Sequence, residues 1–197
     1  MIFDTVMDSD VDDVGALAML HALMSNGEVE ILAVMISSTC PASAACADAV
    51  NTYYGRPGIP IGIKKGKGVN RNIGYVDQVA DKFPHDLVSG EDIPDAKVLY
   101  RKILAGMPDQ SVKILSVGYF TNLADLLRIP GDSISELSGR DLVRAKVTEY
   151  VCTGGKYPED LKYESNGNFE SDGKSVQYVN AHWPGSSISV MSEQEPV

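Results

Sequence analysis

Short apolar segments alternate with longer helical ones along nearly the whole of this 197-residue chain. The short segments are rich in β-branched residues and apolar at most positions, as in residues 30–36 (EILAVMI), which is typical of strands buried on both faces. Strands of this kind, separated by helices, form a parallel sheet covered on both sides. The sequence therefore predicts an α/β fold: one doubly wound, mostly parallel sheet with helices on both faces, in a single domain over residues 1–197.

The predicted elements follow from periodicity, with Gly27 as the stop signal after the first helix. Strands are predicted at residues 1–7, 30–36, 59–63, 112–117, 147–152 and 187–191. Helices are predicted at residues 12–25, 43–54, 76–83, 95–105, 121–127, 135–145 and 173–182, with a basic loop at 64–74 and a polar loop at 157–171.

The bulk composition excludes several classes of partner. A net charge of −10 argues against nucleic acid and against an anionic membrane surface, since both require basic patches. No apolar run reaches the roughly 18–20 residues that span a bilayer, and the N-terminus has no signal-peptide pattern. The odd number of cysteines, three, indicates free thiols in a reducing compartment. We therefore expect a cytoplasmic protein.

Five aspartates lie within the first thirteen residues, between the first predicted strand and the first predicted helix. Like charges this close repel one another, and a hard divalent cation such as Ca²⁺ or Mg²⁺ is the usual partner of clustered carboxylates. Helix capping accounts for one or two of them but not for five. The turn therefore predicts a metal-binding or catalytic site built from Asp4, Asp8, Asp10, Asp12 and Asp13.

Three further polar turns follow predicted strands. They cover residues 37–41, 118–122 and 153–168. Because ligands bind beyond the carboxyl ends of the strands in a doubly wound sheet, we expect these turns and the acidic turn to meet at one pocket. Alone, Thr121 and Asn122 are equally consistent with a helix N-cap, and Asn168 with a turn residue.

Several motifs together resemble the inosine–uridine-preferring nucleoside hydrolase family. The opening Asp4-Thr-Val-Met-Asp-Ser-Asp-Val-Asp-Asp13 aligns without gaps with an acidic opening in a bacterial branch of that family. The resemblance runs nearly end to end and includes residues 51–57 (NTYYGRP), 83–86 (FPHD), 116–124 (SVGYFTNLA), 154–155, 168–169 and 182–184. The acidic opening and the Thr121-Asn122 turn together make it specific.

The resemblance implies an α/β fold, one bound Ca²⁺, and hydrolysis of the N-glycosidic bond of a ribonucleoside by water. It implies that Asp4, Asp13 and the Thr121 carbonyl hold the metal. Asp12 is implied to hold the ribose hydroxyls, and Asn168 to hold the sugar. The partners implied are a small-molecule nucleoside and further copies of the chain, in a dimer or tetramer.

The chain departs from the family at important positions. Val6 stands where the family has an aspartate that ligates the metal and acts as the base, and Asn166 replaces a glutamate. The family's late His-Asp pair would lie beyond Val197, so we expect this domain to lack the C-terminal portion. We therefore expect weakened Ca²⁺ binding and weak or absent hydrolysis, with Asp8 and Asp10 as candidate surrogates for the missing base.

Two alternatives remain from the sequence. One is a non-catalytic relative that binds a nucleoside or ribose. The other is a haloacid-dehalogenase-type phosphatase that uses Asp8 as nucleophile and Asp10 as acid/base with Mg²⁺. The phosphatase reading also needs a downstream acidic pair near a strand end, and no convincing pair of that kind is present in the sequence.

Overall fold

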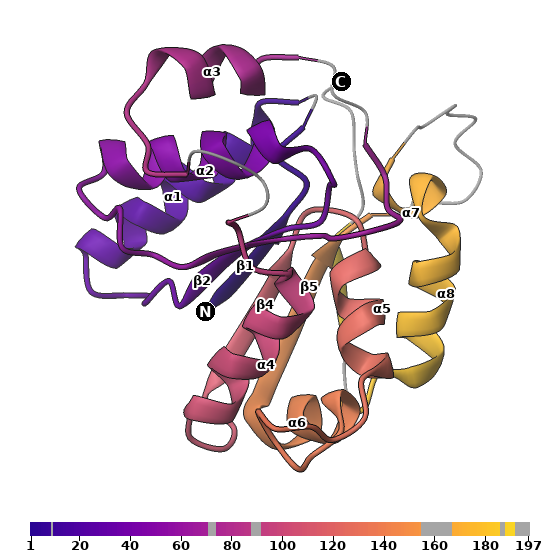
Figure 1. Ribbon diagram of the computed structural model, residues 1–197. Helices are drawn as coiled ribbons and strands as arrows, with labels where there is room; N and C mark the ends of the chain where they lie inside the picture. The colour runs from indigo at the N-terminus through magenta and orange to yellow at the C-terminus, as the bar shows by residue number, and fades with distance from the viewer. Residues whose placement is uncertain (9, 71–73, 88–91, 155–166, 186–187, 192–197) are drawn as a thin grey trace.

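A computed structural model describes residues 1–8, 10–70, 74–87, 92–154, 167–185 and 188–191. Its strands form one six-stranded, all-parallel sheet in the order β3-β2-β1-β4-β5-β6 (Figure 1). The strands are β1 (Ile2–Thr5), β2 (Ala33–Ile36), β3 (Ile61–Ile63), β4 (Val112–Ser116), β5 (Val147–Thr153) and β6 (Ile188–Met191). The helices are α1 (Asp12–Ser25), α2 (Pro41–Tyr53), α3 (Val76–Lys82), α4 (Ala96–Gly106), α5 (Thr121–Arg128), α6 (Gly139–Lys146), α7 (Asn168–Ser171) and α8 (Gly173–His182).

Helices cover the sheet in two layers, as Figure 1 shows. Helices α1, α2 and α3 pack on one face, in a core that includes Phe3 and Val34 of the strands. Helices α4, α5, α6 and α8 pack on the other, in a core that includes Ile2 and Ile114. The doubly wound α/β prediction is therefore confirmed. No described helix has the length and apolarity needed to cross a membrane.

The central strand β1 shows why the strands read as apolar on both faces. Ile2 and Phe3 are consecutive and both fully buried, but they belong to opposite cores because strand side chains alternate. Ile2 pairs with Ala33 of β2 on one side and with Ile114 of β4 on the other. A strand enclosed in this way has no solvent face, and even the polar residues at its end, Asp4 and Thr5, are fully buried.

The order of the strands creates a switch point between β1 and β4. The chain winds outward from β1 to β2 and β3, then crosses back to place β4 on the opposite side of β1. The helices that follow β1 and β4, α1 and α5, therefore pack on opposite faces of the sheet. A switch point of this kind is where ligands of doubly wound sheets bind. The acidic turn and the turn at residues 118–122 both lie at this point.

The structure confirms most predicted helix boundaries within two residues. Gly27 has a left-handed φ of 75°, and the next amide, Glu28 N, donates to Leu23 O across the end of α1. This is the glycine-dependent helix stop that the sequence predicts. Helix α2 begins two residues before its predicted start, at Pro41, because proline is well accommodated in the first turn of a helix.

The predicted start of α6 is wrong by four residues. Residues 135–138 were expected to be helical, but α6 begins at Gly139, with Ser138 as its N-cap. The guanidinium of Arg101, which is buried in α4, donates to the carbonyls of Ser135 and Leu137 at 3.0 Å each. Gly139 N donates to Ile129 O instead of to a preceding helical carbonyl. These contacts hold the segment out of the helix.

The polar loop predicted at residues 157–171 also needs correction. Residues 168–171 form the short helix α7, which the polar composition of that segment conceals. Residues 155–166, which include Gly155, Asn166 and most of this loop, lie outside the described residues. So do Ser9, residues 71–73 of the basic loop and Ser187 of the last predicted strand.

Gly118 allows the ends of β1 and β4 to meet. A Cβ atom at this position would lie 2.5 Å from Val6 N and 2.6 Å from the Thr5 carbonyl carbon, and it would also collide with the Ser37 hydroxyl. Two of these neighbours are backbone atoms, which cannot rotate away. The close approach of the two strand ends therefore depends on a residue without a side chain.

We expect Gly118→Ala to lower the free energy of unfolding by about 1–3 kcal/mol, because the strand ends must separate to admit the methyl group. Urea unfolding followed by circular dichroism measures this. Gly106→Ala is the matched control, because nothing lies within 4 Å of a Cβ at the end of α4. That substitution should be neutral or slightly stabilising. Equal effects of the two substitutions would contradict the steric account.

Candidate functional site

The acidic turn is folded around the carboxylate of Asp13. Asp13 lies in the first turn of α1 and is buried, and it accepts hydrogen bonds from the Thr5 hydroxyl and from Met7 N, the latter at 3.1 Å. Met7 has a left-handed φ of 46°, which is uncommon for a residue with a side chain. The turn is thus a strained backbone held in place by a buried carboxylate, a combination found at functional sites.

Asp4 is buried inside the sheet at the end of β1. It accepts a 2.8 Å hydrogen bond from the Tyr100 hydroxyl of α4 and longer bonds from Asn122 Nδ2 of α5, at 3.3 and 3.4 Å. Burial raises the pKa of Asp4 to about 8, although both donors oppose the shift. Burial likewise raises the pKa of Asp13 to about 7, helped by the nearby charges of Asp12 and Asp10.

Ser37, directly after β2, joins the acidic turn to the turn after β4. Its hydroxyl donates to Thr5 O at 3.1 Å and accepts from Tyr119 N at 2.9 Å. Its carbonyl accepts from the Thr121 hydroxyl at 3.0 Å. Three strand ends are therefore linked through one buried serine.

Asn168, at the start of α7, reaches the same edge of the sheet. Its Nδ2 donates to Val117 O at 2.9 Å, and Val117 N donates to Asp4 O at 2.8 Å. The prediction that the four turns meet is thus supported for Asp4, Asp13, Thr121 and Asn168, which are all connected through short hydrogen-bonded paths. Their metal-binding and sugar-binding roles stay predictions.

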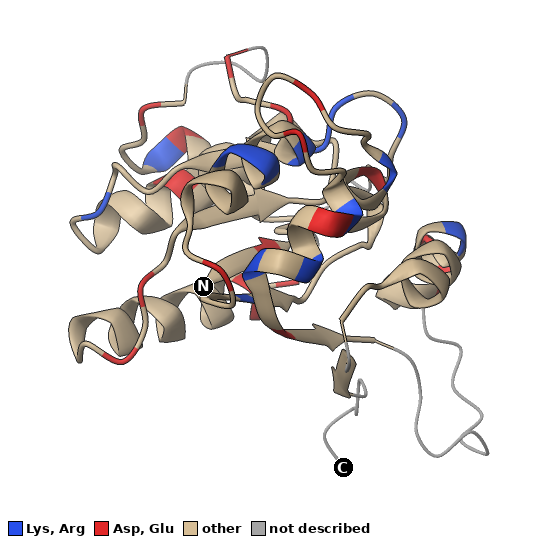
Figure 2. Ribbon diagram, turned by 90° about the horizontal axis from the view of Figure 1, so that it is seen from below, with Lys and Arg blue, Asp and Glu red and all other residues tan. Residues whose placement is uncertain are grey.

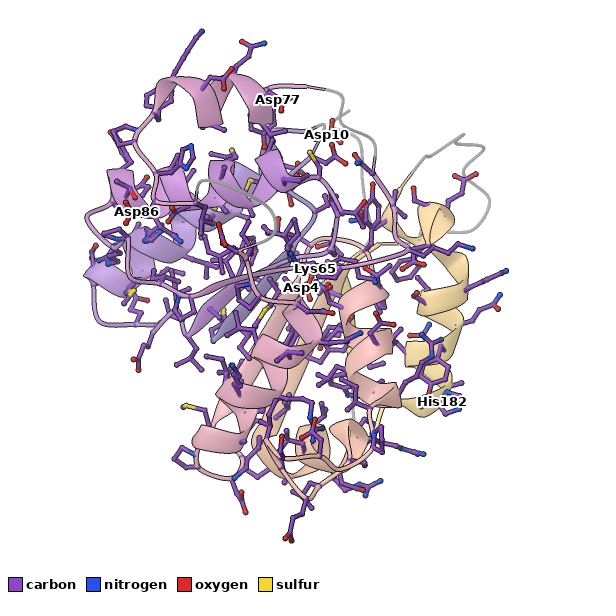
Figure 3. The ribbon with its side chains drawn as sticks, in the orientation of Figure 1. Asp4, Asp10, Lys65, Asp77, Asp86 and His182 are labelled. Carbon is purple, nitrogen blue, oxygen red and sulfur yellow. The ribbon has the colours of Figure 1, made fainter. Side chains whose placement is uncertain are left out.

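The other three aspartates are placed differently. Asp8 is buried, whereas Asp10 and Asp12 are exposed. Figure 3 shows Asp4 in the middle of the fold and Asp10 away from it, near the start of α3. The Asp10 carbonyl accepts from the Tyr75 hydroxyl at 3.0 Å. Asp12 Oδ1 accepts a hydrogen bond from Asp13 N at 3.0 Å, so one of its oxygens binds a backbone amide in the first turn of α1.

Sequence reasoning missed several residues of this arrangement, namely Thr5, Ser37, Tyr75 and Tyr100. Thr5 and Ser37 lie within the polar turns predicted after the first two strands, but no local pattern predicts that their hydroxyls bridge separate strand ends. Tyr100 occupies an ordinary position in the apolar pattern of α4, and no local signal shows that it reaches Asp4, 96 residues away.

The described residues supply oxygen ligands for a cation but not a complete site. Ca²⁺ takes six to eight oxygen ligands. Asp4 and Asp13 are buried carboxylates, and within the described part of the chain Asn122 Oδ1 is buried without a hydrogen-bond partner. However, no group of three or more His, Cys, Asp or Glu among those residues could hold a metal ion, and Val6 adds no ligand. This donor set therefore does not fit a full Ca²⁺ shell.

The raised pKa values of Asp4 and Asp13 predict how metal-free stability depends on pH. The folded chain keeps protons on these carboxyls that the unfolded chain loses above about pH 4. The stability that these two carboxyls contribute is therefore fully present below about pH 4 and is lost as the pH rises through about 7 and 8. In chelator-treated protein, we expect the melting temperature to fall by several degrees, on the order of 5 °C, between about pH 5 and pH 9.

Asp4→Asn should make the melting temperature depend less on pH, because the amide has no proton to lose at that position. Asp81→Asn, at an exposed position of α3, should leave the profile unchanged. Differential scanning calorimetry of the three proteins tests the prediction. A wild-type melting temperature that rises over this range, or an Asp4→Asn profile as steep as the wild-type one, would contradict it.

No protein-family profile matches this sequence, and neither does any curated protein. Solved structures do match. The inosine-uridine preferring nucleoside hydrolase from Bacillus anthracis superposes with a TM-score of 0.65 at 17% identity, over 97% of this chain and 63% of that one. A purine-preferring ribonucleoside hydrolase from Gardnerella vaginalis gives 0.63 at 16% identity, over 98% and 60%.

The type III effector protein XopQ, solved in complex with adenosine diphosphate ribose, gives a TM-score of 0.67 at 17% identity, over 97% of this chain and 56% of that one. The chain therefore spans roughly three fifths of the length of each of these structures. Identities this low establish the architecture alone. The chain has a nucleoside hydrolase-like fold.

Proposed function

We propose that this chain binds the ribose of a ribonucleoside at the carboxyl ends of β1 and β4, and that it hydrolyses the N-glycosidic bond slowly or not at all. The observation that carries the proposal is the convergence of Asp4, Asp13, Thr121 and Asn168 on the switch point of the sheet. Ligands of doubly wound sheets bind at such points. Two of the matched structures are hydrolases of nucleosides, and one holds a ribose-bearing ligand.

The residues available to a ribose are polar and partly accessible. Asp12 is exposed at the start of α1, and a carboxylate accepts hydrogen bonds from two adjacent hydroxyls well. Asn168 is half-buried and fixed by its bond to Val117 O, so its amide is already oriented. We assign ribose binding to these two side chains. Asp4, which is fully enclosed, serves instead to hold the end of β1.

Hydrolysis requires that water attack the anomeric carbon, that the C–N bond break, and that a base accept the proton of the water. Val6 cannot accept a proton. Of the two predicted surrogates, Asp8 is buried and Asp10 is exposed, which favours Asp10 as the group that water can reach. Asp10 also lies away from Asp4, beside Tyr75, so we expect it to be an inefficient base.

The same placement disfavours the phosphatase alternative. A phosphatase of that type needs its nucleophile and its acid/base two residues apart and facing one substrate. Here the carboxylate of Asp8 is enclosed in the protein, whereas that of Asp10 is exposed to solvent. The fold that matches is a nucleoside hydrolase-like one.

We expect isothermal titration calorimetry to detect binding of inosine and weaker binding of 2′-deoxyinosine, which lacks one of the two adjacent ribose hydroxyls that Asp12 would bind. Asp12→Asn should weaken inosine binding about tenfold or more, since hydrogen bonds to charged groups contribute about 1.5–3 kcal/mol. Asp81→Asn is the matched control with an exposed aspartate elsewhere. Equal affinity for the two nucleosides, or no effect of Asp12→Asn, would remove Asp12 from the binding site.

We expect Val6→Asp to increase the release of free base from inosine and uridine about a hundredfold or more, the usual contribution of a positioned base. The variant should also bind Ca²⁺ more tightly than the wild-type chain, because it adds a carboxylate to a short donor set. Chromatography of the released base and calorimetric Ca²⁺ titration measure the two effects. If neither protein binds nucleoside and neither releases base, the proposed function fails.

A further inference from the structure

Lys64, directly after β3, is a buried lysine. Charged residues are spread over the helices and loops of the molecule, as Figure 2 shows, and most of those in the described part of the chain are exposed. Lys64 differs from them, because only 7% of its side chain is accessible. No other lysine that the structure describes is buried. A buried ammonium group is costly unless it is paired, so this position has a physical reason.

The strand register places Lys64 at the same edge of the sheet as the candidate site. Ile63 of β3 pairs with Ile36 of β2, and Ile36 pairs with Thr5 of β1. Lys64 directly follows this row of residues, as Ser37 does on β2, so the two lie side by side at the carboxyl edge. Lys64 N donates to Ile36 O at 2.8 Å, which continues the pairing. Lys64 thus lies two strand spacings, about 10 Å, from the end of β1.

The side chain of Lys64 reaches the face of the sheet that carries α5. Ile63 packs in the core with α1, α2 and α3, and strand side chains alternate, so Lys64 lies on the opposite face. Its ammonium group donates to Lys65 O and forms an ion pair with Asp125 Oδ2 of α5 at 3.2 Å. A Cβ atom at Gly68 would lie 3.1 Å from Lys64 Cγ. The side chain is therefore held between its own loop and α5.

Helix α5 in turn holds part of the candidate site. Thr121, in its first turn, donates to Ser37 O at 3.0 Å. Phe120, which precedes the helix, packs edge-on against Phe169 of α7 with ring centroids 5.1 Å apart. Phe169 directly follows Asn168, one of the two side chains assigned to the ribose. The position of α5 therefore determines the position of Asn168.

We propose that Lys64 is a positioning residue for the sugar site: through Asp125 it fixes α5 on the sheet, and α5 holds Asn168 where it meets the ribose. The inference rests on the proposed function. Asp125 lies one turn after Thr121, so the ion pair and the bond to Ser37 hold the same side of α5. Apolar contacts alone allow small shifts of a helix, whereas hydrogen bonds and paired charges are directional.

Isothermal titration calorimetry with inosine tests the proposal. We expect Lys64→Met, which removes the charge from a side chain of similar length, to weaken binding about tenfold, and Asp125→Asn to do the same. The double variant should bind no more weakly than either single one, because both substitutions remove one ion pair. Lys67→Met is the matched control, because Lys67 is an exposed lysine of the same loop. No effect of Lys64→Met, or an equal effect of Lys67→Met, would overturn the proposal.

The coupling of Lys64 to other residues separates positioning from a general loss of stability. In an Asn168→Ala background, Lys64→Met should have no further effect on inosine binding, since there is no amide left to position. In an Asp12→Asn background it should weaken binding as much as in the wild-type chain, because Asp12 lies on α1, in the opposite helical layer. Equal effects in the two backgrounds would indicate a purely structural role and reject the proposal.

Hydrogen exchange of the free protein gives a readout that needs no nucleoside. The Ala124 amide donates to Phe120 O at 2.9 Å in the first turn of α5. We expect this amide to exchange about tenfold faster in Lys64→Met than in the wild-type chain or in Lys67→Met. Unchanged exchange would overturn the positioning role alone. If the wild-type chain does not bind inosine, the proposed function fails, and the role of Lys64 toward the sugar fails with it.

Discussion

The structure depends on how two carboxyl groups, those of Asp4 and Asp13, are kept inside the protein beside the end of β1. Burying Asp4 and Asp13 without partners would cost several kcal/mol each. The chain satisfies them with four donors from three separate segments: the Thr5 hydroxyl and Met7 N, the Tyr100 hydroxyl, and the Asn122 amide. These hydrogen bonds join the acidic turn, helix α4 and the turn after β4. Burial raises the pKa of both carboxyls even though these donors lower it.

Val6 bears differently on the two parts of the proposed function, sugar binding and hydrolysis. The hydrogen-bonded frame around the switch point is present, including Ser37 and Asn168. Under the proposed function the base would stand at position 6, where this chain carries an aliphatic side chain. Under the proposed function this frame would bind a sugar, since recognition needs oriented polar groups, whereas proton transfer needs a base at the reacting atom. Binding and catalysis therefore make different demands on the same turn.

Much of the architecture was predictable from local patterns. Apolar runs such as residues 30–36 indicated buried parallel strands, and Gly27 marked the end of α1, because both signals act over a few residues. The acidic opening and the Thr121-Asn122 turn indicated where a site would lie. The start of α6 was not predictable, because Arg101 arrives from a distant helix and takes the carbonyls of Ser135 and Leu137. The Tyr100–Asp4 contact was hidden for the same reason. Local periodicity reports which side of a helix is apolar, but not which distant group a polar side chain will meet.

Tyr100 and Arg101 are consecutive residues of α4 that point to different places. Tyr100 reaches Asp4 at the centre of the sheet, whereas Arg101 binds Asp132 and the loop before α6 at 2.8 to 3.0 Å. Each contact involves a group that is expensive to leave unsatisfied when buried. Together they fix the axial position of α4, since sliding this helix along the sheet by even one turn, about 5.4 Å, would break both contacts at once. An insertion or deletion inside α4 should therefore be far less tolerated over evolution than one in the surface turns on either side of it.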